Sequence, residues 1–206
     1  MSITNGYATL QEYLYWIRMR GSGNSDDQID DAVIGNLIEA ASRYFDRETG
    51  KRFYADSTDA TRYYTAVDSL VLKIDPLSAA PTSVSIDTTG LRSYTALTIN
   101  TDFELMPFNA LLDGQPYTEL SIIAILSAYT WPLTVKGVKV VAKFGFPSVP
   151  HDVRDSVIGI AQNLNSARSG QTAGGRITVT AGGVVIRPED VPTFAQRVIQ
   201  HYRGYV

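Results

Sequence analysis

The stretch from Ser25 to Phe53 places the strongest constraint on the fold of this chain. Its apolar residues recur every three or four positions, which is the period of an α-helix with one buried face. The stripe consists of Ile29, Val33, Ile34, Leu37, Ile38, Ala41 and Phe45. An apolar arc this wide is expected to pack against two neighbours rather than one. The second neighbour could be another part of the same core or an adjacent subunit, and the pattern leaves both open.

Both ends of this predicted helix carry boundary signals. Ser25 and Gln28 have the spacing of a capping box, and two aspartates follow Ser25, where the helix dipole favours negative charge. Gly50 is a suitable helix stop, and basic residues lie close to it. The sequence therefore predicts one long helix ending near Gly50.

Other helices are predicted on both sides of this one. Thr9 and Glu12 also have capping-box spacing and open a helix that runs to about Met19. The short linker that follows predicts that the two N-terminal helices form an antiparallel hairpin. Near the other end of the chain, Pro150 and Pro192 each occupy the first position of a predicted helix.

Between these helical regions the sequence changes to short β-type runs. They are rich in β-branched and aromatic residues and are separated by proline and glycine. The runs are Thr61 to Val67, Leu70 to Ile74, Thr82 to Asp87, Tyr94 to Ile99, Tyr117 to Leu126 and Val135 to Phe144. The stretch from Ser121 to Tyr129, which overlaps the end of the fifth run, fits a helix as well as a buried strand. A further hairpin is predicted from Ile177 to Ile186, with its turn at Ala181-Gly182-Gly183.

This order of elements predicts the α+β class. We expect a small helical bundle, made of the N-terminal helix hairpin and the later helices, with an inserted antiparallel β-sheet or small barrel. The expected organisation is a single domain over 1–206. Its helical base would comprise 1–53 and 148–206, and its β subdomain would comprise 54–147.

Composition narrows the possible functions. The 206 residues include no cysteine, so no disulfide, thiol nucleophile or thiolate metal site can form. The net charge of −3 argues against a protein that grips nucleic acid through bulk attraction. The first residues lack the pattern of a secretion signal, and no apolar run approaches the ~20 residues that span a membrane. We therefore expect no membrane association.

No arrangement of residues predicts catalysis, a metal or a cofactor. The two histidines, His151 and His201, are fifty positions apart and lack any metal-motif spacing. His151, Asp152 and Ser156 are the residue types of a triad, but neighbouring residues on one helix point away from each other.

Two further patterns resemble binding motifs only superficially. The glycine spacing from Gly170 to Gly175 is close to that of a phosphate-binding loop, but a predicted strand follows where a helix is required. The acidic cluster Asp26, Asp27, Asp30 and Asp31 lacks the ligand spacing of a calcium loop. We expect a flexible loop and a solvated helix start instead.

Four segments resemble, in the same order, the head–tail connector (adaptor, or head-completion) proteins of tailed bacteriophages. The segment IEAASRYFDRETGKRFY, Ile38 to Tyr54, resembles the main-helix signature of that family. The others are Tyr7 to Trp16, Asp102 to Leu120 and Val140 to Gln162. The long β section, Thr61 to Phe144, departs from the mostly helical minimal members of the family.

The resemblance implies a non-enzymatic structural protein of the virion neck, assembled in the host cytoplasm. Members form rings, usually of twelve subunits, beneath the portal, and extend the channel through which double-stranded DNA passes without sequence recognition. They also support the next stopper or tail protein. The C-terminal segment, Val191 to Val206, corresponds to the portal contact of the family. The residues expected to dock there are Phe194, Val198, Ile199, Tyr202 and Tyr205. We expect that deleting this segment leaves the domain folded and blocks docking.

Other residues are assigned to assembly as hypotheses. A subunit interface is expected at Ile34, Ile38 and Tyr44, since tyrosine is enriched at protein interfaces. A flexible loop and hairpin that order on assembly are expected at Gly170, Gly174, Gly175, Gly182 and Gly183. Two other functions stay open. One is a non-catalytic binding module whose β insertion is a ligand or glycan platform, and the other is a hydrolase built on His151 or the acidic cluster.

Overall fold

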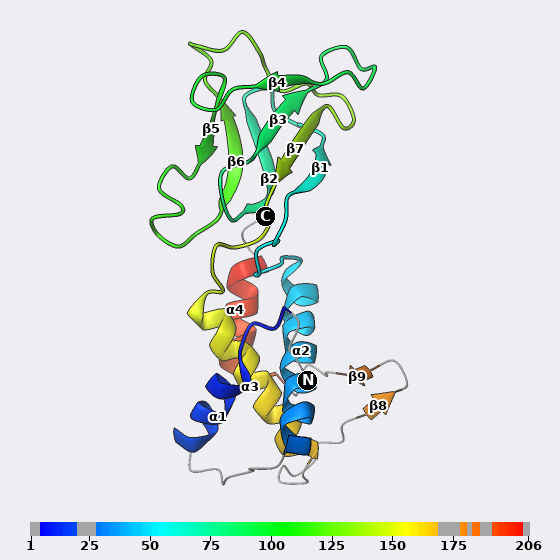
Figure 1. The fold of residues 1–206 in the computed structure, drawn as a ribbon, viewed down its shortest axis with the longest axis vertical. Coiled ribbons are helices and arrows are strands. Elements are labelled where there is room, and N and C mark those ends of the chain that lie inside the picture. The colour runs from blue at the N-terminus through cyan, green and yellow to red at the C-terminus, as the bar shows by residue number, and fades with distance from the viewer. Residues whose placement is uncertain (1–4, 20–27, 169–177, 181–182, 186–190, 204–206) are drawn as a thin grey trace. The chain divides into compact units, whose positions relative to one another are not determined.

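The computed structural model describes residues 5–19, 28–168, 178–180, 183–185 and 191–203 (Figure 1). The chain divides into two compact units. The first, the helical unit, comprises Met1–Phe53 and Val149–Val206, and the second, the β unit, comprises Tyr54–Ser148. Helices and antiparallel sheets occupy separate parts of the chain, so the predicted α+β class is confirmed.

The helical unit contains α1 (Leu10–Met19), α2 (Gln28–Thr49), α3 (His151–Arg168) and α4 (Thr193–Arg203). Helix α2 packs against α1, α3 and α4, and α3 also contacts α1 and α4. The fully buried side chains that fill this bundle include Tyr13, Ile38, Ala41, Phe45, Phe53, Val153, Val157, Ile160, Ala161, Leu164 and Ala195. The wide apolar arc of α2 is therefore used on several sides by helices of its own chain.

The predicted helix boundaries are formed by local hydrogen bonds. The Glu12 amide donates to Thr9 Oγ1 over 3.2 Å and the Thr9 amide donates to Glu12 Oε2 over 2.8 Å, which is a reciprocal capping box. Gly50 follows α2 with φ of 67°, a left-handed conformation that glycine adopts without strain. Pro150 and Pro192 lie one residue earlier than expected, because their carbonyls accept the first helical hydrogen bonds of α3 and α4.

The β unit contains seven strands in two antiparallel sheets. Of the two expected forms, a sheet or a small barrel, the structure has the first, as two sheets packed together. Four strands, in the order β1-β7-β3-β4, form the first sheet, and three, in the order β2-β6-β5, form the second. Their bounds are β1 (Ala60–Tyr64), β2 (Val71–Leu77), β3 (Ser83–Ile86), β4 (Thr95–Leu97), β5 (Phe103–Met106), β6 (Tyr117–Ile122) and β7 (Val138–Ala142).

The two sheets enclose one hydrophobic core. Alternate residues point inward along the central strands, as in Val138 and Val140 of β7 and Leu120 and Ile122 of β6. Trp131, from the connection between β6 and β7, completes this core, and its indole N–H donates to the Leu70 carbonyl over 3.1 Å.

Six of the seven strands overlap the runs predicted from sequence. The exception is β5, Phe103–Met106, a strand of four residues with alternating burial that lies outside every predicted run. The ambiguous stretch is strand only as far as Ile122, and turns follow in which the Leu126 and Ser127 amides donate to the Ile123 carbonyl. The predicted C-terminal hairpin is present as β8 (Thr178–Thr180) paired antiparallel with β9 (Gly183–Val185).

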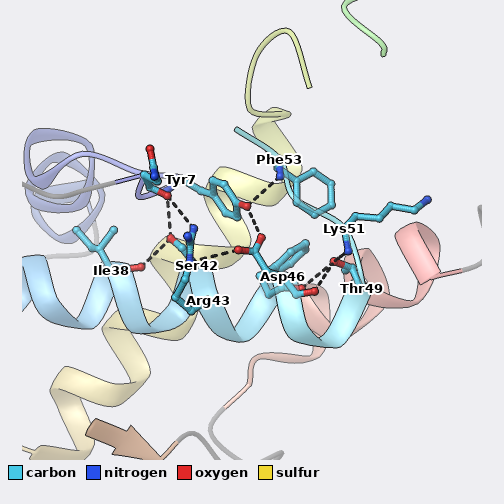
Figure 2. Close-up of polar contacts among 10 residues, drawn as sticks. Tyr7, Ile38, Ser42, Arg43, Asp46, Thr49, Lys51 and Phe53 are labelled. Carbon is cyan, nitrogen blue, oxygen red and sulfur yellow. Dashed lines mark hydrogen bonds and ion pairs between the residues drawn. The ribbon is translucent and has the colours of Figure 1, made fainter. Parts of the chain in front are cut away.

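A buried polar network fixes the N-terminal segment on α2 (Figure 2). The Tyr7 amide donates to Ser42 Oγ over 3.0 Å, while the Tyr7 hydroxyl donates to the Asp46 carboxylate and accepts from the Phe53 amide over 2.9 Å. Arg43 Nε lies 3.2 Å from the same carboxylate. Burial raises the pKa of both the Tyr7 hydroxyl and the Asp46 carboxyl above their ordinary values. One hydroxyl thus links the N-terminal segment, α2 and the chain beyond it.

Replacing Gly145 should destabilise the β unit. Gly145 has φ of 114°, and a Cβ there would lie 1.9 Å from the Tyr54 carbonyl oxygen. We expect Gly145→Ala to lower the free energy of unfolding by about 2 kcal/mol or more in urea titrations followed by fluorescence. Gly90→Ala is the control, because Gly90 has a similar positive φ of 76° but open space around it. Equal losses for both variants would contradict a steric role for the Tyr54 contact.

Removing the Tyr7 hydroxyl should destabilise the helical unit. Tyr7→Phe leaves the buried Phe53 amide without its acceptor and Asp46 without one donor. The expected loss of unfolding free energy is about 1–3 kcal/mol, measured by chemical denaturation. Tyr15→Phe serves as the control, because the Tyr15 side chain is 68% exposed. A loss no larger than that of the control would show that the network contributes nothing to stability.

Candidate interaction surfaces

Helix α4, which carries the residues predicted to dock a partner, is part of the helical core. Ile199 and Tyr202 are buried, and Val198 is half-buried. The Tyr202 ring packs edge-on against Phe53 at 4.9 Å, and its hydroxyl donates to Asp152 Oδ1 over 3.2 Å. Phe194 is 40% exposed, and Tyr205 lies outside the described residues. Of the described members of the set, Phe194 offers the most free surface to a partner.

The burial of α4 argues against the expectation that the segment can be deleted without unfolding the domain. Val191 and Ala195 are buried together with Ile199 and Tyr202, so deletion would uncover the faces of α2 and α3 on which they pack. Helix α4 is also fastened to the end of α2 by Arg203, whose guanidinium pairs with the Glu48 carboxylate. The segment is therefore structural, and its role in docking has to be tested on its exposed side.

The structure also corrects the predicted subunit interface on α2. Ile34 is 4% exposed and Ile38 is fully buried within the chain itself, so both belong to the core and are not available to a neighbouring subunit. The other helices of the unit pack against this part of the apolar arc. Tyr44 is half-buried, with the Arg47 guanidinium 5.2 Å from the centre of its ring. Tyr44 alone keeps surface for the predicted contact.

The predicted assembly loop falls largely outside the described residues. This applies to Gly170, Gly174, Gly175 and Gly182, whereas Gly183 is the first residue of β9. Most of the acidic cluster is also outside the described side chains, and Asp31 lies on α2.

The histidines and the metal-ligating side chains of the described residues do not come together in one site. His151 and His201 are both exposed, at the start of α3 and near the end of α4 respectively. Within the described ranges there is no cluster of three or more metal-ligating side chains. None of the helices described is long and apolar enough to cross a bilayer.

The outer face of the four-stranded sheet carries tyrosines and cations. Lys139 lies on the inner strand β7, directly opposite Tyr63 of β1 and Ser85 of β3. The Tyr63 and Tyr94 rings are 5.9 Å apart. Lys136 Nζ lies 6.0 Å from the Tyr63 ring and Lys139 Nζ lies 5.9 Å from the Tyr94 ring, both within the range of a cation–π contact. We call this surface, formed by Tyr63, Tyr94, Lys136, Lys139 and the adjacent Arg92, the tyrosine–lysine face.

The outer face of the three-stranded sheet carries carboxylates. Glu119 lies on the central strand β6, opposite Lys73 of β2 and Met106 of β5, and Glu104 of β5 lies opposite Ser121. Both glutamates are partly exposed. We call the surface formed by Glu104, Glu119, Lys73 and Met106 the glutamate face.

A third surface is apolar and is formed by loops at one end of the β unit. These loops are tied together, since the Lys136 amide donates to Thr65 Oγ1 over 3.0 Å and Arg92 Nη1 donates to the Val135 carbonyl over 2.6 Å. Their exposed aliphatic residues are Val67, Leu91, Ile125, Leu126, Leu133 and Val135. Exposed apolar groups that gather in this way are typical of a surface that meets another protein.

Sequence reasoning missed all three surfaces of the β unit. Alternation within each strand identifies outward-facing residues, but the pairing of β7 with β1 brings together segments more than seventy positions apart, and its pairing with β3 joins segments more than fifty positions apart. Lys139 and Tyr63 are therefore neighbours only because of the strand register. Trp131, the only tryptophan of the β unit, is buried in the core and offers no aromatic platform to a ligand.

Truncating a buried residue of α4 should destabilise the helical unit far more than truncating its exposed neighbour. We expect Ile199→Ala to lower the free energy of unfolding by about 2–4 kcal/mol, through lost burial and the cavity left behind. Gln200→Ala, at an exposed position of the same helix, should stay within about 0.5 kcal/mol of the unmodified chain. Circular dichroism in urea measures both. Similar small effects would mean that α4 is dispensable for the fold.

Comparison with known proteins gives a match of fold. Neither the protein-family models nor the curated proteins include a match to this chain. Among solved structures, the chain is similar to one in the neck of an empty GTA (gene transfer agent) particle computed with C6 symmetry. The TM-score is 0.53 at 16% sequence identity, over 98% of this chain and 92% of that chain. The two chains therefore share a fold over nearly their whole length.

Proposed function

We propose that this chain is a structural protein of the head–tail neck of a tailed-phage-like particle. In this proposal it forms a ring and takes part in no catalysis. The observation that carries the proposal is the similarity over 98% of the chain to a chain from the neck of a GTA particle. The independent resemblance of four sequence segments to phage head–tail connectors supports the same assignment.

The finer features of the proposal follow the connector family. The ring would lie beneath the portal, would contain twelve subunits in the virion, and would surround double-stranded DNA in transit. A stopper or tail protein would bind on its other side. The apolar loop end of the β unit and the partly exposed Phe194 of α4 each suit a protein partner, and a connector needs more than one such surface.

A non-catalytic binding module is the second candidate. Its supporting observation is the pair of tyrosines, Tyr63 and Tyr94, on an exposed sheet face. Two features argue against a glycan platform. Trp131 is buried, and each of the two rings already has a lysine ammonium at about the limit of cation–π contact.

Electron microscopy of the chain co-expressed with the portal protein of the same genome tests the proposal. Rings stacked coaxially on the portal are expected. Dispersed monomers that ignore the portal and bind immobilised sugars would overturn the proposal in favour of the binding module.

Portal docking by α4 is tested with substitutions on its exposed side. Phe194→Ser combined with Arg197→Glu should reduce the fraction of portals that carry a ring, because both positions are exposed. Tyr15→Ser, at an exposed position of α1, is the control, and circular dichroism confirms that each variant is folded. Full occupancy with the α4 variant would contradict a docking role for this helix.

A further inference from the structure

The two outer faces of the β unit have complementary chemistry, and this points to how copies of the chain meet. We propose that the tyrosine–lysine face of one copy packs against the glutamate face of the next copy around the ring. The inference rests on the proposed ring-forming function and adds the surfaces that join its subunits.

The first step of the argument is that the two faces point in opposite directions. Val138 and Val140 of β7, and Leu120 and Ile122 of β6, all point into the core between the sheets. Because side chains alternate along a strand, Lys139 and Glu119 point out of the unit on its two opposite sides. A head-to-tail contact between identical subunits requires two different surfaces, and a rotation that closes gives a ring.

The second step concerns charge. The lysines of the tyrosine–lysine face, Lys136 and Lys139, take part in no ion pair within the described part of the chain. The same is true of Glu104 and Glu119 on the other face. By contrast, Arg62 of β1 pairs with Asp75 of β2 over 2.6 Å. Each face therefore keeps charges that a second copy can neutralise.

The third step concerns the neutral residues of the two faces. Tyrosine and methionine are enriched at the centres of protein interfaces, and Tyr63 and Met106 occupy positions next to Lys139 and Glu119 respectively. Both charged residues belong to inner strands of their sheets, so they lie near the middle of each face. The pattern is an interface centre with aromatic and apolar contacts around opposite charges.

Nucleic acid is the other partner that cations and aromatic rings can suggest, and the observations favour a second copy. The Arg92 guanidinium already donates to the backbone carbonyls of Val135 and Lys136, over 2.6 and 3.3 Å. Stacking on bases requires open ring faces, whereas the Tyr63 and Tyr94 rings already pack against each other and against the two lysine ammonium groups, on a chain of net charge −3. Matching carboxylates on the opposite face have no role in DNA binding.

Cross-linking through introduced cysteines tests the contact directly, because the natural chain has no cysteine. Lys139→Cys and Glu119→Cys are combined in one chain and treated with a short bis-maleimide in the ring preparation. The two positions cannot be bridged within one copy by a reagent shorter than the unit, since the two packed sheets lie between them.

The expected product is a ladder of dimers, trimers and higher multiples on a denaturing gel. Each single-cysteine variant should give dimers at most. A double variant that forms rings by microscopy but gives no ladder would overturn the inference and leave the ring-forming function intact. Absence of rings from the unmodified chain would instead contradict the proposed function, and the inference, which rests on that function, would be overturned as well.

Charge exchange gives an independent test. Lys136→Glu with Lys139→Glu, and Glu104→Lys with Glu119→Lys, should each reduce the fraction of chains in rings by about tenfold or more, because like charges then meet. The chain that carries all four substitutions should recover rings. Gln11→Glu with Tyr15→Glu, which adds negative charge at exposed positions of α1, is the control and should assemble normally.

Two results of the charge exchange would overturn the inference. One is normal ring assembly by both double variants. The other is loss of binding to linear duplex DNA in mobility-shift assays by Lys136→Glu with Lys139→Glu while its rings persist, which would assign the face to nucleic acid.

Discussion

The structure of the helical unit depends on the packing around Phe53. This fully buried ring meets Phe45 of α2 at 5.5 Å, Tyr7 of the N-terminal segment at 5.7 Å and Tyr202 of α4 at 4.9 Å, all in edge-on geometry. Such aromatic contacts bury large areas and favour one orientation of each ring. The Tyr7 hydroxyl accepts from the amide of the same Phe53. Three segments far apart in sequence are therefore held at the residue where the chain leaves the helical unit.

This arrangement explains why α4 is structural as well as a candidate contact surface. Its buried side contributes Ile199 and Tyr202 to the bundle, and its exposed side leaves Phe194 partly accessible. A helix used in this way presents its outer residues from a rigid base, which lowers the entropy lost when a partner binds. The β unit presents its own surfaces on paired strands, so their geometry is likewise set before assembly.

Much of the local structure follows from the sequence by simple physics. The period of the apolar residues predicted α2, and the Thr9–Glu12 capping box and Gly50 predicted two helix boundaries that hydrogen bonds and a positive φ bear out. Alternating β-branched runs predicted six of the seven strands. The strand β5 was not predicted because its alternating pattern covers only four residues, and its pairing with β6, which the sequence does not show, stabilises it.

By itself, then, the sequence determined the α+β class, the order of the elements and most of their boundaries, because these depend on short-range periodicity and on capping. Only the tertiary structure decided how the apolar arc of α2 is used: Ile34 and Ile38 are buried within the chain, since three other helices cover α2. It also decided which outward-facing residues become neighbours. Lys139 meets Tyr63, and Glu119 meets Met106, through strand register alone. Register is set by pairing between distant segments, and no local pattern in the sequence specifies it.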